Sequence, residues 1–142
     1  EKLGVKIQLA GKMNQKLEQE FSRQAGVIVS ANPPNIYRVA EGAIAGLCPI
    51  RVGAGMQNKI LDYMAMGVPV ITSEIAAEPF KKELSLRIAK TAGDYVKHVE
   101  ELMKDRDLWR SESARMRSAA ELYDWDVKLD PFVSIVKMCL QD

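Results

Sequence analysis

The segment Arg51–Ser73 holds the residues whose types and spacing could do chemistry. Gly53 and Gly55 precede an apolar helical pattern, and glycine allows a backbone to approach a ligand closely. The first N–H groups of a helix have no partner within the helix, and together with the helix dipole they favour an anion such as phosphate. The sequence therefore predicts a phosphate site at this turn. Its candidate binding residues are Gly53, Gly55, Met56, Gln57, Asn58 and Lys59.

The same spacing permits a simpler interpretation. In this interpretation Gly53 and Gly55 form a tight turn and bind no ligand. Lys59 and Asp62 lie three residues apart on one helical face and can be a solvated pair that contributes ~0.3–0.5 kcal/mol. The segment lacks the third glycine of a dinucleotide fingerprint and the Gly-Lys-Ser/Thr of a P-loop. Spacing alone leaves both interpretations open, and it assigns no catalytic residue.

The strands and helices that position this turn are predicted from apolar runs that alternate with helical patterns. Strands are expected at residues 4–10, 26–30, 42–49, 68–72 and 86–89, and helices at 14–24, at 56–66, from 91, at 107–123 and after 131. Strands separated by helices form βαβ units. The predicted fold class is therefore α/β, with one doubly wound, mostly parallel, Rossmann-like sheet in a single domain over residues 1–142. Ligands bind at the carboxyl ends of the strands in such sheets, and the glycine turn falls there.

Local signals predict several helix ends. Asn14 and Asn35 are suited to N-capping. Thr91 and Asp94 have the spacing of a capping box, with aspartate in place of the usual glutamate or glutamine. Gly67 is suited to the left-handed residue that ends a helix. The helix that follows the glycine turn is therefore expected to end at Gly67.

Composition argues against several classes of function. The 142 residues include 20 Lys and Arg and 19 Asp and Glu, a net charge of +1, so we expect no nucleic-acid partner. Cys48 and Cys139 form no CxxC pair and His98 is the single histidine, so neither a metal site nor a disulfide framework is predicted. The longest apolar stretch, residues 43–50, is too short to span a bilayer, and the first residues show no signal-peptide pattern. We expect a cytoplasmic protein.

Residues 51–70 resemble the donor-binding motif of the group 1 glycosyltransferases, which are retaining enzymes built from two Rossmann-like domains (the GT-B architecture). The sequence DYMAMGVPV at residues 62–70 is similar to the family's Glu-Ala-Met-Ala-x-Gly-x-Pro-Val. Residues 5–11 and 40–49 resemble strands that the family places around this motif, and residues 123–126 resemble the start of its terminal helix. The chain therefore resembles most of a C-terminal, donor-binding domain.

The resemblance implies a hexosyltransferase of polysaccharide biosynthesis. Its donor would be a nucleotide sugar such as a UDP- or GDP-sugar, with no other cofactor and no bound metal. Asp62 would bind the ribose hydroxyls, and the amides of Gly55–Asn58 would hold the phosphates. The partner would be an N-terminal acceptor domain, missing here, of a longer protein that could associate peripherally with the inner face of the membrane. This chain alone would transfer no sugar.

Two positions depart from the family pattern. The first glutamate of the family's acidic pair falls at Ala54, which carries no carboxylate, and Asp62 is one methylene shorter than the second glutamate. The turn resembles instead a subgroup that has Gly-x-Gly and a lysine. Lys59 is expected to compensate by contacting the diphosphate or the sugar.

Two alternative functions remain open. A non-catalytic nucleotide-binding or interaction module on the same fold is the first, because a fold does not determine a function. Half of a sugar-nucleotide epimerase is the second, which the match at residues 62–70 disfavours. Glu74 and Glu78 could line the cleft, where they could contact the donor sugar or act as acid and base. The residues expected on the surface are Lys81, Lys82 and His98, and those expected in the core are Trp109, Met116, Tyr123 and part of the stripe from Phe132 to Leu140.

Overall fold

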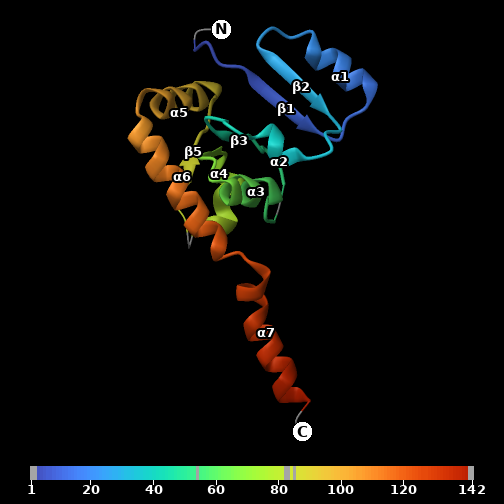
Figure 1. Ribbon diagram of the computed structural model, residues 1–142, viewed down its shortest axis with the longest axis vertical. Coiled ribbons are helices and arrows are strands. Elements are labelled where there is room, and N and C mark those ends of the chain that lie inside the picture. Colours follow the sequence, from blue (N-terminus) through green and yellow to red (C-terminus); the bar gives the residue numbers. More distant parts are fainter. Residues whose placement is uncertain (1–2, 54, 82–83, 85, 141–142) are drawn as a thin grey trace. The chain divides into compact units, whose positions relative to one another are not determined.

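The computed structural model describes residues 3–53, 55–81, 84 and 86–140 (Figure 1). Its strands are β1 (Ile7–Gly11), β2 (Val27–Ala31), β3 (Gly46–Cys48), β4 (Val70–Thr72) and β5 (Arg87–Ile88). Its helices are α1 (Gln15–Ser22), α2 (Ile36–Val39), α3 (Asn58–Met66), α4 (Glu74–Ala77), the 3-10 turn η1 (Glu78–Phe80), α5 (Ala92–Lys104), α6 (Arg106–Glu121) and α7 (Trp125–Cys139). The strand pairs among these residues are all parallel. The predicted α/β class is confirmed.

The described strands form two sheets rather than the one sheet expected. β1 pairs with β2 in the first, and β3, β4 and β5 lie in that order in the second. The two sheets differ from the prediction because β3, within the described strands, hydrogen-bonds to β4 alone. The chain divides correspondingly into two compact units, residues 1–42 and 43–142, and each is described by itself. That residues 1–142 form a single domain stays a prediction.

In the 1–42 unit, asparagines determine where the helices begin. The Asn14 side chain accepts a hydrogen bond from the Leu17 N–H at 3.0 Å, and the Asn35 side chain accepts one from the Tyr37 N–H at 2.9 Å. Both predicted N-caps are therefore confirmed. The amide oxygen in each case satisfies an N–H group that the helix itself leaves without a partner.

Asn32 ties together the carboxyl ends of β1 and β2. Its backbone has a φ of 49°, a left-handed conformation that asparagine tolerates better than most residues. Its N–H donates to the Gly11 carbonyl at 2.8 Å. Its side chain accepts from the Met13 N–H at 3.3 Å and donates to the Met13 carbonyl at 3.1 Å. These bonds order the loop after β1 against the loop after β2.

In the 43–142 unit, helices cover both faces of the sheet. Successive residues of β4 point to opposite sides. Val70 packs with Met64 of α3 and Met116 of α6 in one buried cluster, and Ile71 packs with Leu102 of α5 in the other. This arrangement confirms, for the second sheet, the predicted parallel layer between two layers of helices.

Helix α3 begins two residues later than predicted, at Asn58 rather than Met56, because Gln57 is extended, with φ −90° and ψ 102°. The helix ends where predicted. Gly67 has a φ of 69°, and a Cβ added there would clash with the Arg117 guanidinium. Position 67 therefore requires glycine both for its backbone conformation and for space.

Helices α5 and α6 of this unit have side-chain caps. The predicted capping box of α5 is confirmed, since Thr91 and Asp94 each accept a hydrogen bond from the other's backbone N–H. α6 begins at Arg106, and the Asp105 side chain accepts from the Leu108 N–H at 2.8 Å. Met116 is buried in the core as predicted.

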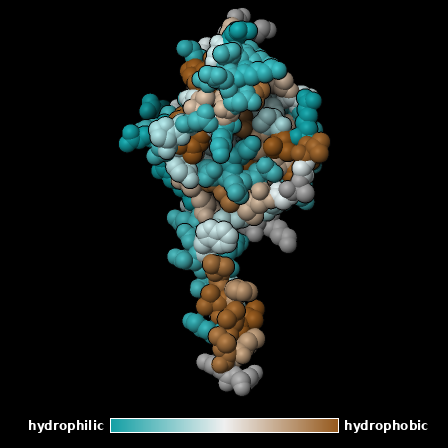
Figure 2. Space-filling model, turned by 90° about the vertical axis from the view of Figure 1, so that its right-hand side faces the viewer, coloured by the Kyte–Doolittle hydropathy of each residue, from teal (hydrophilic) through white to brown (hydrophobic). Residues whose placement is uncertain are grey.

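Helix α7 begins at Trp125, within the residues 123–126 that resemble the start of the family's terminal helix, and not after Pro131 as the apolar pattern predicts. The Asp124 side chain caps it by accepting from the Asp126 N–H at 2.9 Å, and Pro131 lies inside the helix. Apolar side chains gather on its surface (Figure 2), and α7 has no buried residue. None of the helices in the described ranges combines the length and apolar character that crossing a bilayer requires.

Candidate functional site

The glycine turn follows the carboxyl end of β3, as the sequence predicts. Gly53 has a φ of 155° and Gly55 a φ of 81°, and both values lie in the region that side chains disfavour. Among the described residues other than its neighbours in the chain, Gly55 has no heavy atom within 4 Å of the position that a Cβ would take. The backbone of Gly55 is therefore open to an approaching ligand.

The N-terminus of α3 comes directly after this turn. The Gln57 side chain makes no capping hydrogen bond to the described residues of α3, and the first turn carries no acidic residue. Lys59 lies in that turn with an exposed side chain. Burial raises the pKa of the Cys48 thiol at the end of β3, and the positive charge of Lys59 acts in the opposite direction. Lys59 therefore extends its field to the carboxyl end of β3.

A cavity of about 550 Å³ lies beside the turn. Its size is in the range of roughly 300–1,000 Å³ that is common for small-molecule sites. The described residues that line it are Gly53, Gly55, Glu74, Ile75, Glu78, Pro79 and Lys81. Segments after β3 and after β4 thus meet at the carboxyl edge of one parallel sheet, where ligands bind in α/β folds.

One wall of the cavity carries its charged side chains, Glu74, Glu78 and Lys81, which we call the acidic wall. The Ser73 side chain caps α4 by accepting from the Ala76 N–H at 3.4 Å, and this places Glu74 at the start of the helix. Lys81 forms an ion pair with Glu78, and the hydrogen bond to this carboxylate raises the pKa of the Lys81 ammonium. Lys90 approaches Glu74 to 4.0 Å.

The structure brings only part of the predicted site to this cavity. Gly53 and Gly55 line it, and Glu74 and Glu78 join them as considered from the sequence. Among the described lining residues, the remaining candidates are absent. Met56 and Gln57 lie between the turn and α3, Asn58 and Lys59 begin the helix, and Asp62 is half-buried in its second turn. Ala54 and Lys82 lie outside the described residues.

Sequence reasoning missed three of the lining residues, Ile75, Pro79 and Lys81, and Lys81 was expected to be only a solvated surface charge. A signal was present: Glu74, Glu78 and Lys81 are spaced at i, i+4 and i+7, which places them on one face of a helix. The structure forms that segment as α4 followed by η1, and all three side chains line the cavity.

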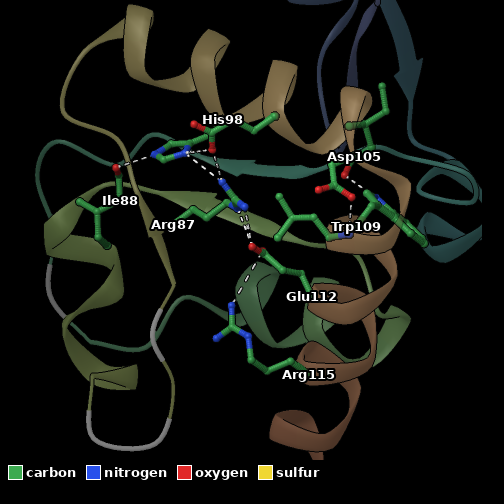
Figure 3. Close-up of polar contacts among 10 residues, drawn as sticks. Arg87, Ile88, His98, Asp105, Trp109, Glu112 and Arg115 are labelled. Atoms are coloured by element: carbon green, nitrogen blue, oxygen red, sulfur yellow. Dashed lines mark hydrogen bonds and ion pairs between the residues drawn. The ribbon is translucent and has the colours of Figure 1, made fainter.

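His98 belongs to a different cluster, in which it holds Arg87 and the end of β5 (Figure 3). Its Nδ1 lies 3.1 Å from Arg87 Nη1, and its Nε2 lies 3.1 Å from the Ile88 carbonyl oxygen. Nδ1 also lies 3.4 Å from Glu101 Oε2, so the ring contacts both members of the Arg87–Glu101 ion pair as well as the end of β5. The side chain is 22% exposed. The prediction of a surface histidine is therefore wrong, because this packing was not visible in the sequence.

The Arg87 network comprises Arg87, His98, Glu101 and Glu112, and it joins β5 to α5 and α6. Figure 3 shows Arg87 between His98 and Glu112. Arg87 donates from Nη1 to Glu101 Oε2 at 2.7 Å, and from Nη2 and Nε to Glu112 Oε1 at 2.6 and 2.9 Å. The bond from Arg87 lowers the pKa of Glu101, and the carboxylates, Glu112 first, raise the pKa of Arg87. The donor groups of Arg87 point at Glu101 and Glu112, which belong to the same network. We therefore assign the network a structural role.

The groups near the cavity can bind an anion and hydroxyl groups. Backbone amides at the turn, the α3 N-terminus and Lys59 favour negative charge, and the carboxylates of the acidic wall accept hydrogen bonds. Within the described ranges, no three His, Cys, Asp or Glu residues are grouped so that they could hold a metal ion.

Comparison with known proteins identifies the family of the chain. A sequence profile described as "Glycosyl transferases group 1" matches residues 1–105. No curated protein and no solved structure matches the chain significantly. The profile covers well over half of the 142 residues and includes the glycine turn, α3 and the acidic wall. The chain belongs to the group 1 glycosyl transferases.

Proposed function

We propose that this chain binds the nucleotide-sugar donor of a retaining glycosyl transfer. The observation that carries the proposal is the cavity at the carboxyl edge of the β3–β4 sheet, which is lined by the glycine turn and lies beside the α3 N-terminus. Backbone amides without helical partners next to an open cavity suit the phosphates of a nucleoside diphosphate. Membership of the group 1 family supplies the reaction class.

In this proposal the glycine turn and the second turn of α3 have different roles. The backbone of Gly53 and Gly55 and the first amides of α3 hold the diphosphate, and Lys59 adds positive charge. Asp62, one turn further along the helix, accepts hydrogen bonds from the ribose hydroxyls. A carboxylate has two oxygens that can accept such hydrogen bonds.

The acceptor side of the reaction lies on another domain in this proposal. A transferase brings acceptor and donor together and excludes water between them, and orientation of that kind can supply ~7–11 kcal/mol of the barrier reduction. We therefore propose that the chain binds donor and needs an acceptor domain for transfer to a glycan or to a lipid-linked acceptor at the membrane.

A titration of the chain with UDP, GDP and ADP tests the donor site. The readout is the set of backbone amide chemical shifts, and we expect perturbations concentrated between Gly53 and Asp62 with at least one of the three nucleotides. Amides of α5, around Glu100, serve as the internal control and should not shift. If no nucleotide at millimolar concentration perturbs the glycine turn, the donor-site proposal is wrong.

The same titration separates the alternative function. A transferase domain should bind a nucleotide sugar at the same amides as the free nucleoside diphosphate, and additional shifts should appear in residues 74–81. A nucleotide-binding module without a sugar site should show the first set of shifts and not the second.

A further inference from the structure

We propose that the acidic wall selects the charge of the donor sugar, so that the site accepts a neutral hexose and disfavours a hexuronic acid. This inference rests on the proposed donor site and goes beyond it, because the family assignment does not say which sugar is bound. Its basis is the position of Glu74, Glu78 and Lys81 on one wall of the cavity whose other described lining residues are Gly53, Gly55, Ile75 and Pro79.

The division of charge around the cavity separates two parts of a nucleotide sugar. The diphosphate is anionic, so it belongs at the glycine turn, where backbone amides and Lys59 favour negative charge. The acidic wall repels phosphate, and its carboxylate oxygens instead accept hydrogen bonds from hydroxyl groups. A neutral sugar offers several hydroxyl donors. Ile75 and Pro79 line the same cavity and can pack against the C–H groups of the sugar ring.

The balance of charge on this wall is negative. Two carboxylates and one ammonium line the cavity, and the ammonium of Lys81 is paired with Glu78. Glu74 is approached by Lys90 only to 4.0 Å, and both of these side chains are well exposed, so the pairing is weak. A carboxylate on the sugar would therefore meet two lining carboxylates that are opposed by one lining ammonium, together with the distant, exposed Lys90.

Two substitutions should move this selectivity in opposite directions. Glu74→Gln keeps the size and the hydrogen-bonding capacity of the side chain but removes its charge, so a hexuronic acid should bind relatively better. Lys81→Met removes the cation that neutralises Glu78, so a hexuronic acid should bind relatively worse. A substitution that acted only by disturbing the local fold would weaken both sugars together and would leave their ratio unchanged.

The test measures dissociation constants of the chain for UDP, UDP-glucose and UDP-glucuronate by calorimetry, or for GDP, GDP-mannose and GDP-mannuronate if guanine nucleotides bind. We expect the hexose to bind more tightly than the hexuronate. Exposed charge pairs have modest energies, so Glu74→Gln should reduce the hexose preference about two- to fivefold, and Lys81→Met should increase it by a similar factor. Raising the salt from about 50 to 500 mM should reduce the preference in the wild type.

Glu121→Gln is the matched control, since it removes one carboxylate from the exposed end of α6, outside the described lining of the cavity. It should leave the ratio unchanged. If the nucleoside diphosphates bind but the ratio does not respond to Glu74→Gln and Lys81→Met, this inference is wrong while the donor site stands. If Glu74→Gln changes the affinity for UDP and for both sugars equally, the wall contacts the nucleotide and the inference is also wrong. If no nucleoside diphosphate binds, the proposed donor site fails and the inference fails with it.

Discussion

Two clusters of charged side chains in the 43–142 unit combine the same chemical groups in different surroundings. In the Arg87 network, the Arg87 and Glu112 side chains are only 13% and 12% exposed, and three donor groups of the guanidinium reach carboxylates within 3 Å. In the acidic wall, the Lys81 and Glu78 side chains are 49% and 68% exposed. A cluster whose groups satisfy one another in a nearly buried position stabilises the fold. A cluster that lines a cavity and stays exposed can exchange its solvent contacts for a ligand.

The first prediction tests the structural side of this comparison and has the largest expected effect. Arg87→Met leaves the nearly buried Glu112 without its main cation, because Arg115 approaches this carboxylate only to 3.8 Å. Removing one partner of such a pair is strongly destabilising, and we expect the free energy of unfolding to fall by about 3 kcal/mol. Urea denaturation measures the change.

Arg110→Met is the matched control, since Arg110 is paired with Asp107 at 3.2 Å in an exposed position on the same helix as Glu112. It should cost less than about 1 kcal/mol. Equal losses for Arg87→Met and Arg110→Met would contradict the structural role of the Arg87 network.

The second prediction tests the ligand side. Lys59→Ala should weaken the binding of a nucleoside diphosphate by about 1.5 kcal/mol, roughly tenfold, because it removes a charge-assisted contact to phosphate. Binding of the nucleoside alone should change much less, and the stability of the chain should stay the same because Lys59 is exposed. Calorimetry with UDP and uridine, or with GDP and guanosine, gives both affinities.

Lys104→Ala provides the comparison for Lys59→Ala, since it removes an exposed lysine of α5 that is paired with Glu100 at 3.4 Å. It should affect neither affinity. Equal losses for nucleoside and diphosphate on Lys59→Ala would exclude a phosphate contact for this lysine.

The third prediction concerns acid stability and has a smaller effect, because Glu101 is 40% exposed. Arg87 holds the pKa of Glu101 below its ordinary value of 4.5, so the folded state binds fewer protons than the unfolded state near that pH. The stabilisation is therefore present above about pH 4.5 and is lost as the pH falls through the lower, folded-state pKa.

Urea denaturation between pH 7 and pH 3 measures this loss. Glu101→Gln should show a shallower decrease in stability over the acid range than the wild type. The capping carboxylate Asp94, whose pKa is lowered by the backbone N–H of Thr91, should continue to contribute in both proteins. A Glu101→Gln variant with an unchanged acid limb would show that the ion pair with Arg87 contributes nothing to stability.

Local signals in the sequence predicted the fold well where a few neighbouring residues decide the structure. The caps at Asn14 and Asn35, the capping box at Thr91 and the end of α3 at Gly67 all depend on contacts within four residues. The apolar stripe after the proline predicted too late a start for α7, whereas the resemblance at residues 123–126 placed it correctly, where the Asp124 side chain caps the helix.

The site could be predicted only in part, because its members come from different elements. Gly53 and Gly55 carry a local signal, and so does the helix that follows them. Lys81 joins them in the cavity only through the packing of segments that follow β3 and β4. The Arg87 network depends in the same way on side chains that meet across β5, α5 and α6, separated by 11 to 25 residues. Contacts between residues this far apart in the sequence leave no local pattern from which they could be predicted.

The last prediction has the smallest expected effect on stability and completes the comparison of the two clusters. Lys81→Met breaks the ion pair with Glu78, yet both side chains are exposed, and such pairs contribute little because water solvates the separated charges. We therefore expect the free energy of unfolding to change by less than about 0.5 kcal/mol, against about 3 kcal/mol for Arg87→Met. The measurement is the same urea titration, carried out at pH 7. A loss above about 1.5 kcal/mol would place Lys81 with the structural cluster, because a residue that supports the fold this strongly is not free to respond to a ligand. A change within the expected limit would mean that the stability of the fold does not explain why Lys81 and Glu78 lie at the cavity.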